Sequence, residues 1–144
     1  MPMTVCSRSL FSGFAAALSI CCANAQSTGP TAKFSGIDWQ KAEIVTVSMV
    51  DYAFSPRRVT FHYGVPTRLR LVNTSADIHD FTAPDFFRTV ELRDATSMGS
   101  SGVGIVVEPH QQRDIDLIAR RRGEFALICA DHDWAGMTAS IVVE

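Results

Sequence analysis

Short segments rich in branched apolar and aromatic residues alternate with turn residues along most of the chain. From residue 43 onward, this pattern predicts strands at 43–51, 57–63, 67–73, 103–108, 113–119, 124–129 and 137–143. The lengths and spacings of these segments are typical of an antiparallel β-sandwich. We therefore expect an all-β domain of about seven to eight strands.

Two of the predicted strands alternate strictly between apolar and charged residues. In one of them, Leu69 and Leu71 are separated by arginines, and residues 114–117 repeat the pattern with aspartates. Because successive side chains of a strand point to opposite faces, the apolar residues are expected in the core and the charged ones in water.

The stretch between residues 84 and 102 departs from the strand pattern. Pro84 and the residues up to Arg88 predict a helical turn, while Ser97 to Gly102 are small residues typical of a loop. We expect a short helical insertion near 84–95.

The first 25 residues have the layout of a secretory signal peptide. A stretch with one cation, Arg8, precedes a short apolar run that ends at Ala23-Asn24-Ala25. The run is shorter than the roughly 20 residues of a spanning helix. We expect cleavage after Ala25, a periplasmic or otherwise secreted protein with no membrane span, a flexible segment at 26–42 and one domain at 43–144.

The overall charge is mildly acidic. The chain has 13 basic and 15 acidic residues, and only one basic residue falls in the expected signal peptide. This balance argues against nucleic acid as a partner.

The cysteine distribution separates one thiol from the rest. Cys6, Cys21 and Cys22 lie in the expected signal peptide, so Cys129 stands alone in an exported chain. A lone thiol in an oxidising compartment is a buried small side chain, half of an intermolecular disulfide, a nucleophile or a metal ligand.

The neighbours of Cys129 favour a metal site. His132 and Met137 follow it on the same loop. A thiolate, an imidazole and a thioether together suit copper, which must be held in two oxidation states. Trigonal copper coordination requires a second histidine from elsewhere, and His79, which follows a predicted strand in an apolar setting, is a better candidate than His62 or His110.

The spacing Cys-x-x-His-x-x-x-x-Met from Cys129 to Met137, with Gly136 before the methionine, resembles the copper loop of plastocyanins and pseudoazurins. Residues 51–56, 64–73 and 79–81 resemble bacterial cupredoxin-like domains, so the resemblance covers about residues 43–144. It implies a Greek-key β-sandwich that binds one type 1 copper ion. The implied ligands are His79, Cys129, His132 and Met137, with the methionine in the axial position.

Two positions depart from the pattern of the family. Asp80 stands where plastocyanins usually have asparagine, and His110 occupies a turn where the family often has glycine. Neither departure removes a ligand, but a carboxylate changes the hydrogen bonds that brace the copper loop.

The function that this resemblance implies is one-electron transfer without bond-making chemistry. We expect a monomer that exchanges electrons with a cytochrome or oxidoreductase, with His132 nearest the surface and with Phe81, Trp134 and Ala135 limiting water access. Asp77, Asp131 and Asp133 would either attract a basic partner or form a solvated rim.

Two other functional classes use the same residues. In the first, the chain stores copper, confers resistance to it or delivers it to a copper acceptor. In the second, an enzyme uses Cys129 as nucleophile with His132 or His79 as base, which would leave Met137 without a role. A structural zinc site fits less well, because methionine is a poor zinc ligand.

Overall fold

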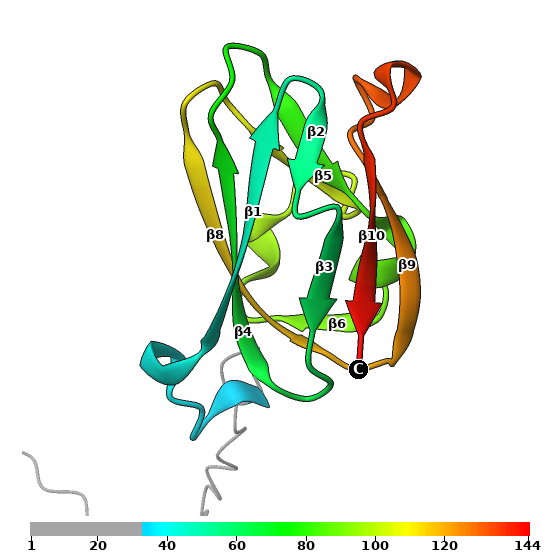
Figure 1. Cartoon of the computed structure of the whole chain (residues 1–144). Coiled ribbons are helices and arrows are strands. Elements are labelled where there is room, and N and C mark those ends of the chain that lie inside the picture. The colour runs from blue at the N-terminus through cyan, green and yellow to red at the C-terminus, as the bar shows by residue number, and fades with distance from the viewer. Residues whose placement is uncertain (1–32) are drawn as a thin grey trace, which may run out of the picture.

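Two five-stranded sheets lie face to face in the computed structural model, which describes residues 33–144 (Figure 1). The first sheet has the order β2 (Ala53–Ser55), β1 (Glu43–Val50), β4 (Pro66–Asn73), β8 (Gln112–Ala119) and β6 (Val90–Leu92). The second has the order β3 (Arg58–Phe61), β10 (Thr138–Val143), β9 (Gly123–Ile128), β5 (His79–Thr82) and β7 (Gly104–Val107). The all-β sandwich is confirmed, with ten strands among residues 33–144 in place of the expected seven to eight.

Three strands escaped the sequence-based prediction because they are short. The strands β2, β5 and β6 have three or four residues each, too few to display a clear alternation. The predicted helical turn is confirmed as α1 (Pro84–Phe87), with Pro84 at its first position. The rest of the insertion contains β6 and the 3-10 turn η3 (Ala95–Ser97).

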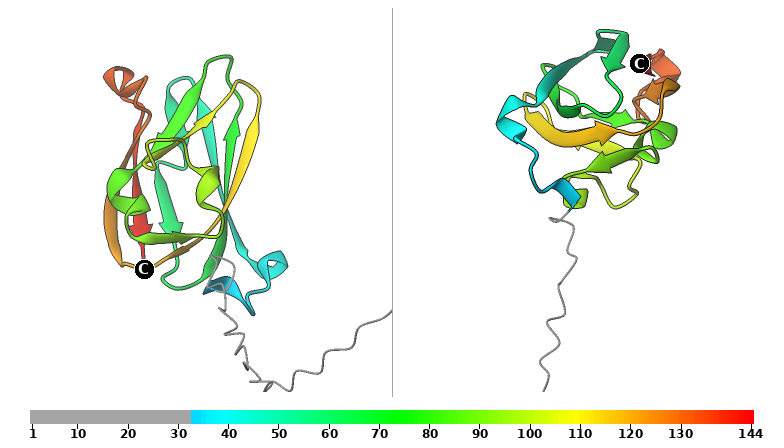
Figure 2. Two further views of the ribbon diagram at one scale, coloured as in Figure 1. Left: turned by 180° about the vertical axis from the view of Figure 1, so that it is seen from behind. Right: turned by 90° about the horizontal axis from the view of Figure 1, so that it is seen from below.

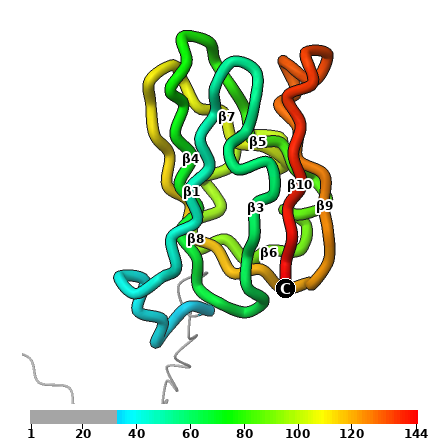
Figure 3. The backbone as a smooth tube through the Cα atoms, viewed as in Figure 1, coloured from blue at the N-terminus to red at the C-terminus, as the bar shows by residue number. Residues whose placement is uncertain are grey.

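The sequence pattern indicated an antiparallel sandwich, but two of the strand pairs are parallel. The strand β1 pairs with β4 in parallel, and β3 pairs with β10 in parallel. After β2 the chain crosses to the other sheet as β3 and then returns to the first sheet as β4 (Figure 3). This excursion places β4 beside β1 in the same direction, and no local pattern reveals it.

The alternating strands place their side chains as expected. Leu69 and Leu71 of β4 are fully buried. The intervening arginines reach across to β8, where the Arg68 guanidinium binds Asp116 through two bonds of 2.8 and 3.1 Å, and Arg70 binds Asp114 in the same way. These bidentate pairs hold the register of β4 against β8 on the outer face.

A cluster of phenylalanine rings fills the space between the sheets. Phe54, Phe61, Phe81 and Phe86 are at most 1% exposed. Removing each such side chain from water contributes about 1.5–3 kcal/mol. The core therefore reaches from β2 to the residues that follow His79 on β5.

The segment 26–42 was expected to be flexible, and the structure describes its part from residue 33 onward. There the 3-10 turn η2 (Trp39–Lys41) places Trp39 against the domain with 8% of its surface exposed, and the Arg93 guanidinium lies 5.3 Å from the centre of the Trp39 ring. The expected signal peptide, residues 1–25, lies outside the described residues. Among residues 33–144, no helix has the length and apolar character needed to cross a membrane.

His62 pairs with an acidic residue far from the proposed ligands. Its Nδ1 lies 2.9 Å from a Glu43 carboxylate oxygen, and this hydrogen bond raises the pKa of His62 above 6.5.

We expect an NMR titration to give His62 a pKa above 6.5, and Glu43→Gln to lower it. Because the folded-state pKa is raised, the stabilising contribution is complete below pH 6.5 and is lost as pH rises through the folded-state pKa. An unchanged His62 pKa in Glu43→Gln would contradict the pairing.

The connections that matter for the site lie together at one end of the sandwich. The loops β1–β2, β4–β5 and β9–β10 meet at the upper end in Figure 1, while the C-terminus lies at the other end (Figure 2). Residues from three distant parts of the sequence are thereby brought side by side.

Candidate metal centre

His79 begins β5, directly after a loop that a buried amide holds in place. The Asn73 side chain donates to the carbonyl oxygens of Asp77 at 2.8 Å and Val107 at 3.0 Å, and its oxygen accepts from the Ser75 backbone at 3.0 Å and hydroxyl at 2.8 Å. Asn73 is 1% exposed, so these bonds form out of water, where leaving them unmade is costly. The loop therefore delivers the His79 side chain, itself fully buried, in a defined position.

Cys129 directly follows β9 and opens a tight loop that closes on Met137. The Cys129 amide donates to the Met137 carbonyl at 3.0 Å, while the Met137 amide donates to the His132 carbonyl at 3.2 Å. Between them lies the 3-10 turn η4 (Asp133–Ala135), which ends at Gly136 with a left-handed φ of 79°. Glycine adopts this conformation without strain, so Gly136 allows the chain to turn into β10.

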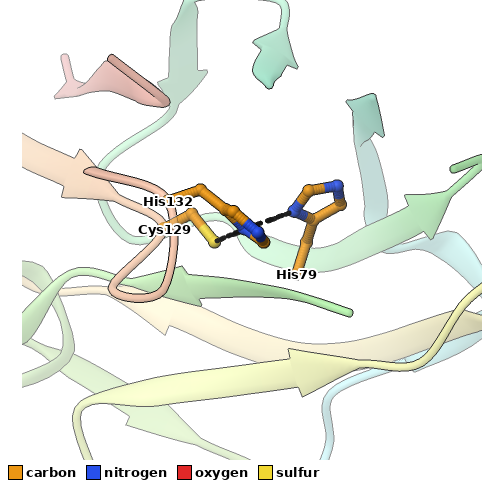
Figure 4. Close-up of side chains that lie close together, drawn as sticks. All are labelled: His79, Cys129 and His132. Carbon is orange, nitrogen blue, oxygen red and sulfur yellow. Dashed lines mark hydrogen bonds between the residues drawn. The ribbon is translucent and has the colours of Figure 1, made fainter. Parts of the chain in front are cut away.

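Three donor atoms converge at this end of the sandwich (Figure 4). The Nδ1 atoms of His79 and His132 are 3.2 Å apart, and the Cys129 sulfur lies 3.8 Å from the first and 3.5 Å from the second. Cys129 and His79 are fully buried, and His132 is partly exposed. Residues 50 positions apart in the sequence thus point at one another.

The spacing of the three donors fits a single metal ion. Histidine nitrogen and cysteine sulfur bind first-row transition-metal ions at about 2.0–2.3 Å. In a trigonal arrangement, these bond lengths separate the donor atoms by about 3.5–3.9 Å. The observed separations of 3.2–3.8 Å are close to these values. Two imidazoles and one thiolate form the donor set that selects copper in a trigonal site.

The far side of the His79 ring faces a carboxylate. Its Nε2 lies 3.3 Å from Asp51 in the turn after β1. A hydrogen bond from Nε2–H to Asp51 leaves the Nδ1 lone pair free to face Cys129 and His132. Asp51 can therefore hold the imidazole with Nδ1 toward Cys129 and His132, a contact that the sequence did not indicate.

An aromatic residue of the same turn covers His132. The Tyr52 ring lies 4.8 Å from the His132 ring at an interplanar angle of 40°, and the Tyr52 hydroxyl donates to Asp77 at 3.2 Å. The sequence-based expectation that Trp134 shields the metal is wrong, because Trp134 is 77% exposed. The η4 turn carries Trp134 outward, where its indole N–H donates to the Asp131 carbonyl at 3.0 Å.

The remaining sequence-based candidates are Met137, His62 and His110. Met137 is fully buried at the end of the loop, and its role as axial ligand stays a prediction. His62 is exposed just after β3, and His110 is exposed in the turn before β8 with a φ of 57°. As expected, neither of these two histidines lies in the cluster formed by His79, Cys129 and His132.

Burial controls the chemistry of the thiol. Desolvation raises the pKa of Cys129 from its ordinary value of 9.0 to about 11, and the Asp80 carboxylate adds to the rise while the Asp80 backbone N–H opposes it. In the metal-free protein the thiol therefore keeps its proton at neutral pH. Binding of a metal ion must displace this proton.

We expect Cys129 to resist alkylation in the folded, metal-free protein. A rise of two pKa units lowers the thiolate fraction at pH 8 by about a hundredfold, and burial slows the reaction further. Iodoacetamide labelling of the chain from residue 26 onward, followed by mass spectrometry, would measure the rate. The same chain in urea is the control, and equal rates in the two states would contradict the burial of Cys129.

Comparison with known proteins points to one family. The profile of the cupredoxin-like domain family matches residues 13–143. A comparison with curated proteins finds no match. Among solved structures, auracyanin B is 15% identical over 72% of this chain and 89% of its own, with a TM-score of 0.54.

Two further auracyanins have the same fold. Dithionite-reduced auracyanin from Roseiflexus castenholzii is 15% identical over 72% of this chain and 98% of its own, with a TM-score of 0.53. Auracyanin A from Chloroflexus aurantiacus, described as a blue copper protein, is 15% identical over 70% of this chain and 98% of its own, with a TM-score of 0.51. At this level of identity, the likeness shows the shared fold.

Proposed function

Because this chain belongs to the cupredoxin-like domain family, we propose that it binds one type 1 copper ion and carries single electrons between redox partners. The observation that carries the proposal is the convergence of two imidazole nitrogens and one buried thiol within 3.8 Å of one another. His79, Cys129 and His132 are the proposed equatorial ligands. Met137, held by the same loop, is the proposed axial ligand.

The protein's own part in this function is to keep the ligands still. A bound copper ion supplies the one-electron couple. Asn73 fixes the loop before His79, while the backbone bonds between Cys129, His132 and Met137 fix the other ligands. Ligands that move little between the two oxidation states keep the reorganisation small, which favours a carrier.

The absorption and paramagnetic resonance spectra of the copper-loaded chain test this proposal. We expect an intense visible band from thiolate-to-copper charge transfer and reversible one-electron cycling. A colourless copper(II) form would overturn the type 1 assignment. Rapid transfer of copper to an acceptor without reversible cycling would instead favour copper storage or delivery.

His132 is the proposed exit route for the electron, since it is the ligand that is partly exposed. Exposed apolar side chains lie near it, with Tyr52 against the His132 ring and Trp134 6.1 Å from the Tyr52 ring. The exposed acids Asp77 and Asp131 lie in the β4–β5 and β9–β10 loops at the same end of the sandwich. A redox partner with a basic surface, such as a cytochrome, fits this arrangement.

Reversing one of these charges should slow association with such a partner. We expect Asp131→Lys to lower the association rate with a basic c-type cytochrome several-fold at low ionic strength, with a smaller effect at high salt. Stopped-flow mixing at two salt concentrations would measure it. The control is Glu124→Lys at the start of β9, and equal effects of the two substitutions would argue against steering at the metal end.

We further propose that the protein is exported as a monomer after removal of residues 1–25. The composition of those residues and the lone Cys129 in the remaining chain support export. Mass spectrometry of the periplasmic fraction should find a chain that begins at Gln26. An intact N-terminus in the cytoplasm would contradict this.

A further inference from the structure

A buried carboxylate lies between β5 and the loop that carries Cys129. Asp80 follows His79 and is 7% exposed. Its oxygens accept the Ala130 N–H at 2.8 and 3.0 Å, the Asp131 N–H at 3.4 Å and the Thr82 hydroxyl. Asp80 thereby ties β5 to the first residues after Cys129.

The same residue touches the sulfur from two sides. The Asp80 backbone N–H donates to the Cys129 sulfur at 3.4 Å, and in the metal-free protein the thiol donates to Asp80 Oδ2 at 3.2 Å. Within residues 33–144, no lysine, arginine or histidine forms an ion pair with Asp80. Its negative charge is therefore satisfied by N–H and O–H dipoles and is not cancelled by a cation.

We propose that Asp80 is a positioning residue that also lowers the reduction potential of the copper site. Its carboxylate holds the Cys129–Asp131 backbone, and its charge lies beside the ligand sulfur in a buried setting. A fixed negative charge favours the more positive oxidised state over the reduced one, and burial strengthens the effect. The inference rests on the proposed electron-carrier function, in which one redox partner supplies the electron and another accepts it.

Asp80→Asn removes the charge and keeps the shape. The amide oxygen still accepts the Ala130 N–H, while the amide nitrogen replaces the second carboxylate oxygen. We expect the ratio of copper(I) to copper(II) affinities to rise at least about tenfold, which is a rise of about 59 mV in the potential of a one-electron couple. Equilibrium redox titration of the copper-loaded protein measures the change.

The matched control is Asp131→Asn. It makes the same chemical change two residues from Cys129, but the Asp131 side chain is exposed, so water and salt screen its charge. We expect a shift of the potential well below that of Asp80→Asn. Equal shifts in the two variants, or no rise in Asp80→Asn, would overturn the proposal.

A second variant changes the potential in the opposite direction and retains the carboxylate. Thr82→Val deletes a hydroxyl that donates to Asp80, leaving the negative charge less compensated. We expect its potential to fall, while the backbone bonds from Ala130 remain. If Asp80→Asn fails to fold, an unchanged or raised potential in Thr82→Val overturns the inference.

The bracing role has its own measurement in the metal-free protein. Asp80→Ser retains a small acceptor but shortens the side chain, so the Ala130 amide should exchange its hydrogen faster by NMR than in the wild type. Unchanged exchange would contradict bracing. If the proposed function is wrong, the copper-loaded wild type will lack the blue band. If only this inference is wrong, the wild type will be blue and will cycle reversibly, but Asp80→Asn will leave its reduction potential unchanged.

Discussion

Replacement of Cys129 by serine is expected to abolish the blue colour of the copper-loaded protein. The charge-transfer transition requires a thiolate ligand. A serine oxygen is a harder donor and does not produce this transition. The sulfur also lies within 3.8 Å of both histidine Nδ1 atoms, so its loss removes one corner of the donor triangle. The visible spectrum after copper addition measures the effect.

The serine variant should retain its fold, because the buried hydroxyl can donate to Asp80 where the thiol does now. Far-ultraviolet circular dichroism of the metal-free form checks this. His62→Ala is a control that removes an exposed histidine remote from the cluster and should leave the band intact. A blue Cys129→Ser protein would mean that the chromophore has another origin.

Truncation of Phe81 is expected to produce a large loss of stability. The side chain is fully buried, with its ring 6.2 Å from Phe54 and 6.0 Å from Phe87. Phe81→Ala should lower the free energy of unfolding by about 3–5 kcal/mol, since it removes apolar contacts and leaves a cavity. Urea unfolding of the metal-free protein followed by circular dichroism measures the loss.

The control for Phe81 lies on the neighbouring strand. Val106 of β7 is 50% exposed, so Val106→Ala should change the free energy of unfolding by less than about 0.5 kcal/mol. Phe81 lies two residues after His79, so the cavity should also weaken copper binding. A loss in Phe81→Ala no larger than in Val106→Ala would show that the core does not depend on this ring.

The features that the sequence revealed are those carried by neighbouring residues. Alternation predicted the buried Leu69 and Leu71, and the spacing of Cys129, His132 and Met137 marked a single loop. For the second histidine ligand, the sequence offered three candidates, and His79 was preferred because its neighbours are apolar. That choice depends on contacts between strands, and the distances at the site agree with it.

Other features carry no local mark. Asp51 and Tyr52 look like ordinary turn residues, yet the turn folds over His79 and His132. The amide of Asn73 gains its role only from burial between the two sheets. The sequence marked Asp80 as a departure from the family pattern, but only the structure shows that its carboxylate accepts the Ala130 N–H. The prediction that Trp134 shields the metal failed because the hydrophobicity of a residue does not determine on which side of a turn its side chain lies.

By itself, the sequence determined the strand-forming segments, the lone thiol after residue 25 and a loop with soft and imidazole donors, because alternation, count and spacing are properties of adjacent residues. Only the tertiary structure decided the parallel pairs β1–β4 and β3–β10, the meeting of His79 with Cys129 across 50 residues, and the carboxylates behind each of them. These features depend on how the two sheets pack around a shared core. The free energy gained by burying that core comes from contacts between segments that are far apart in the chain.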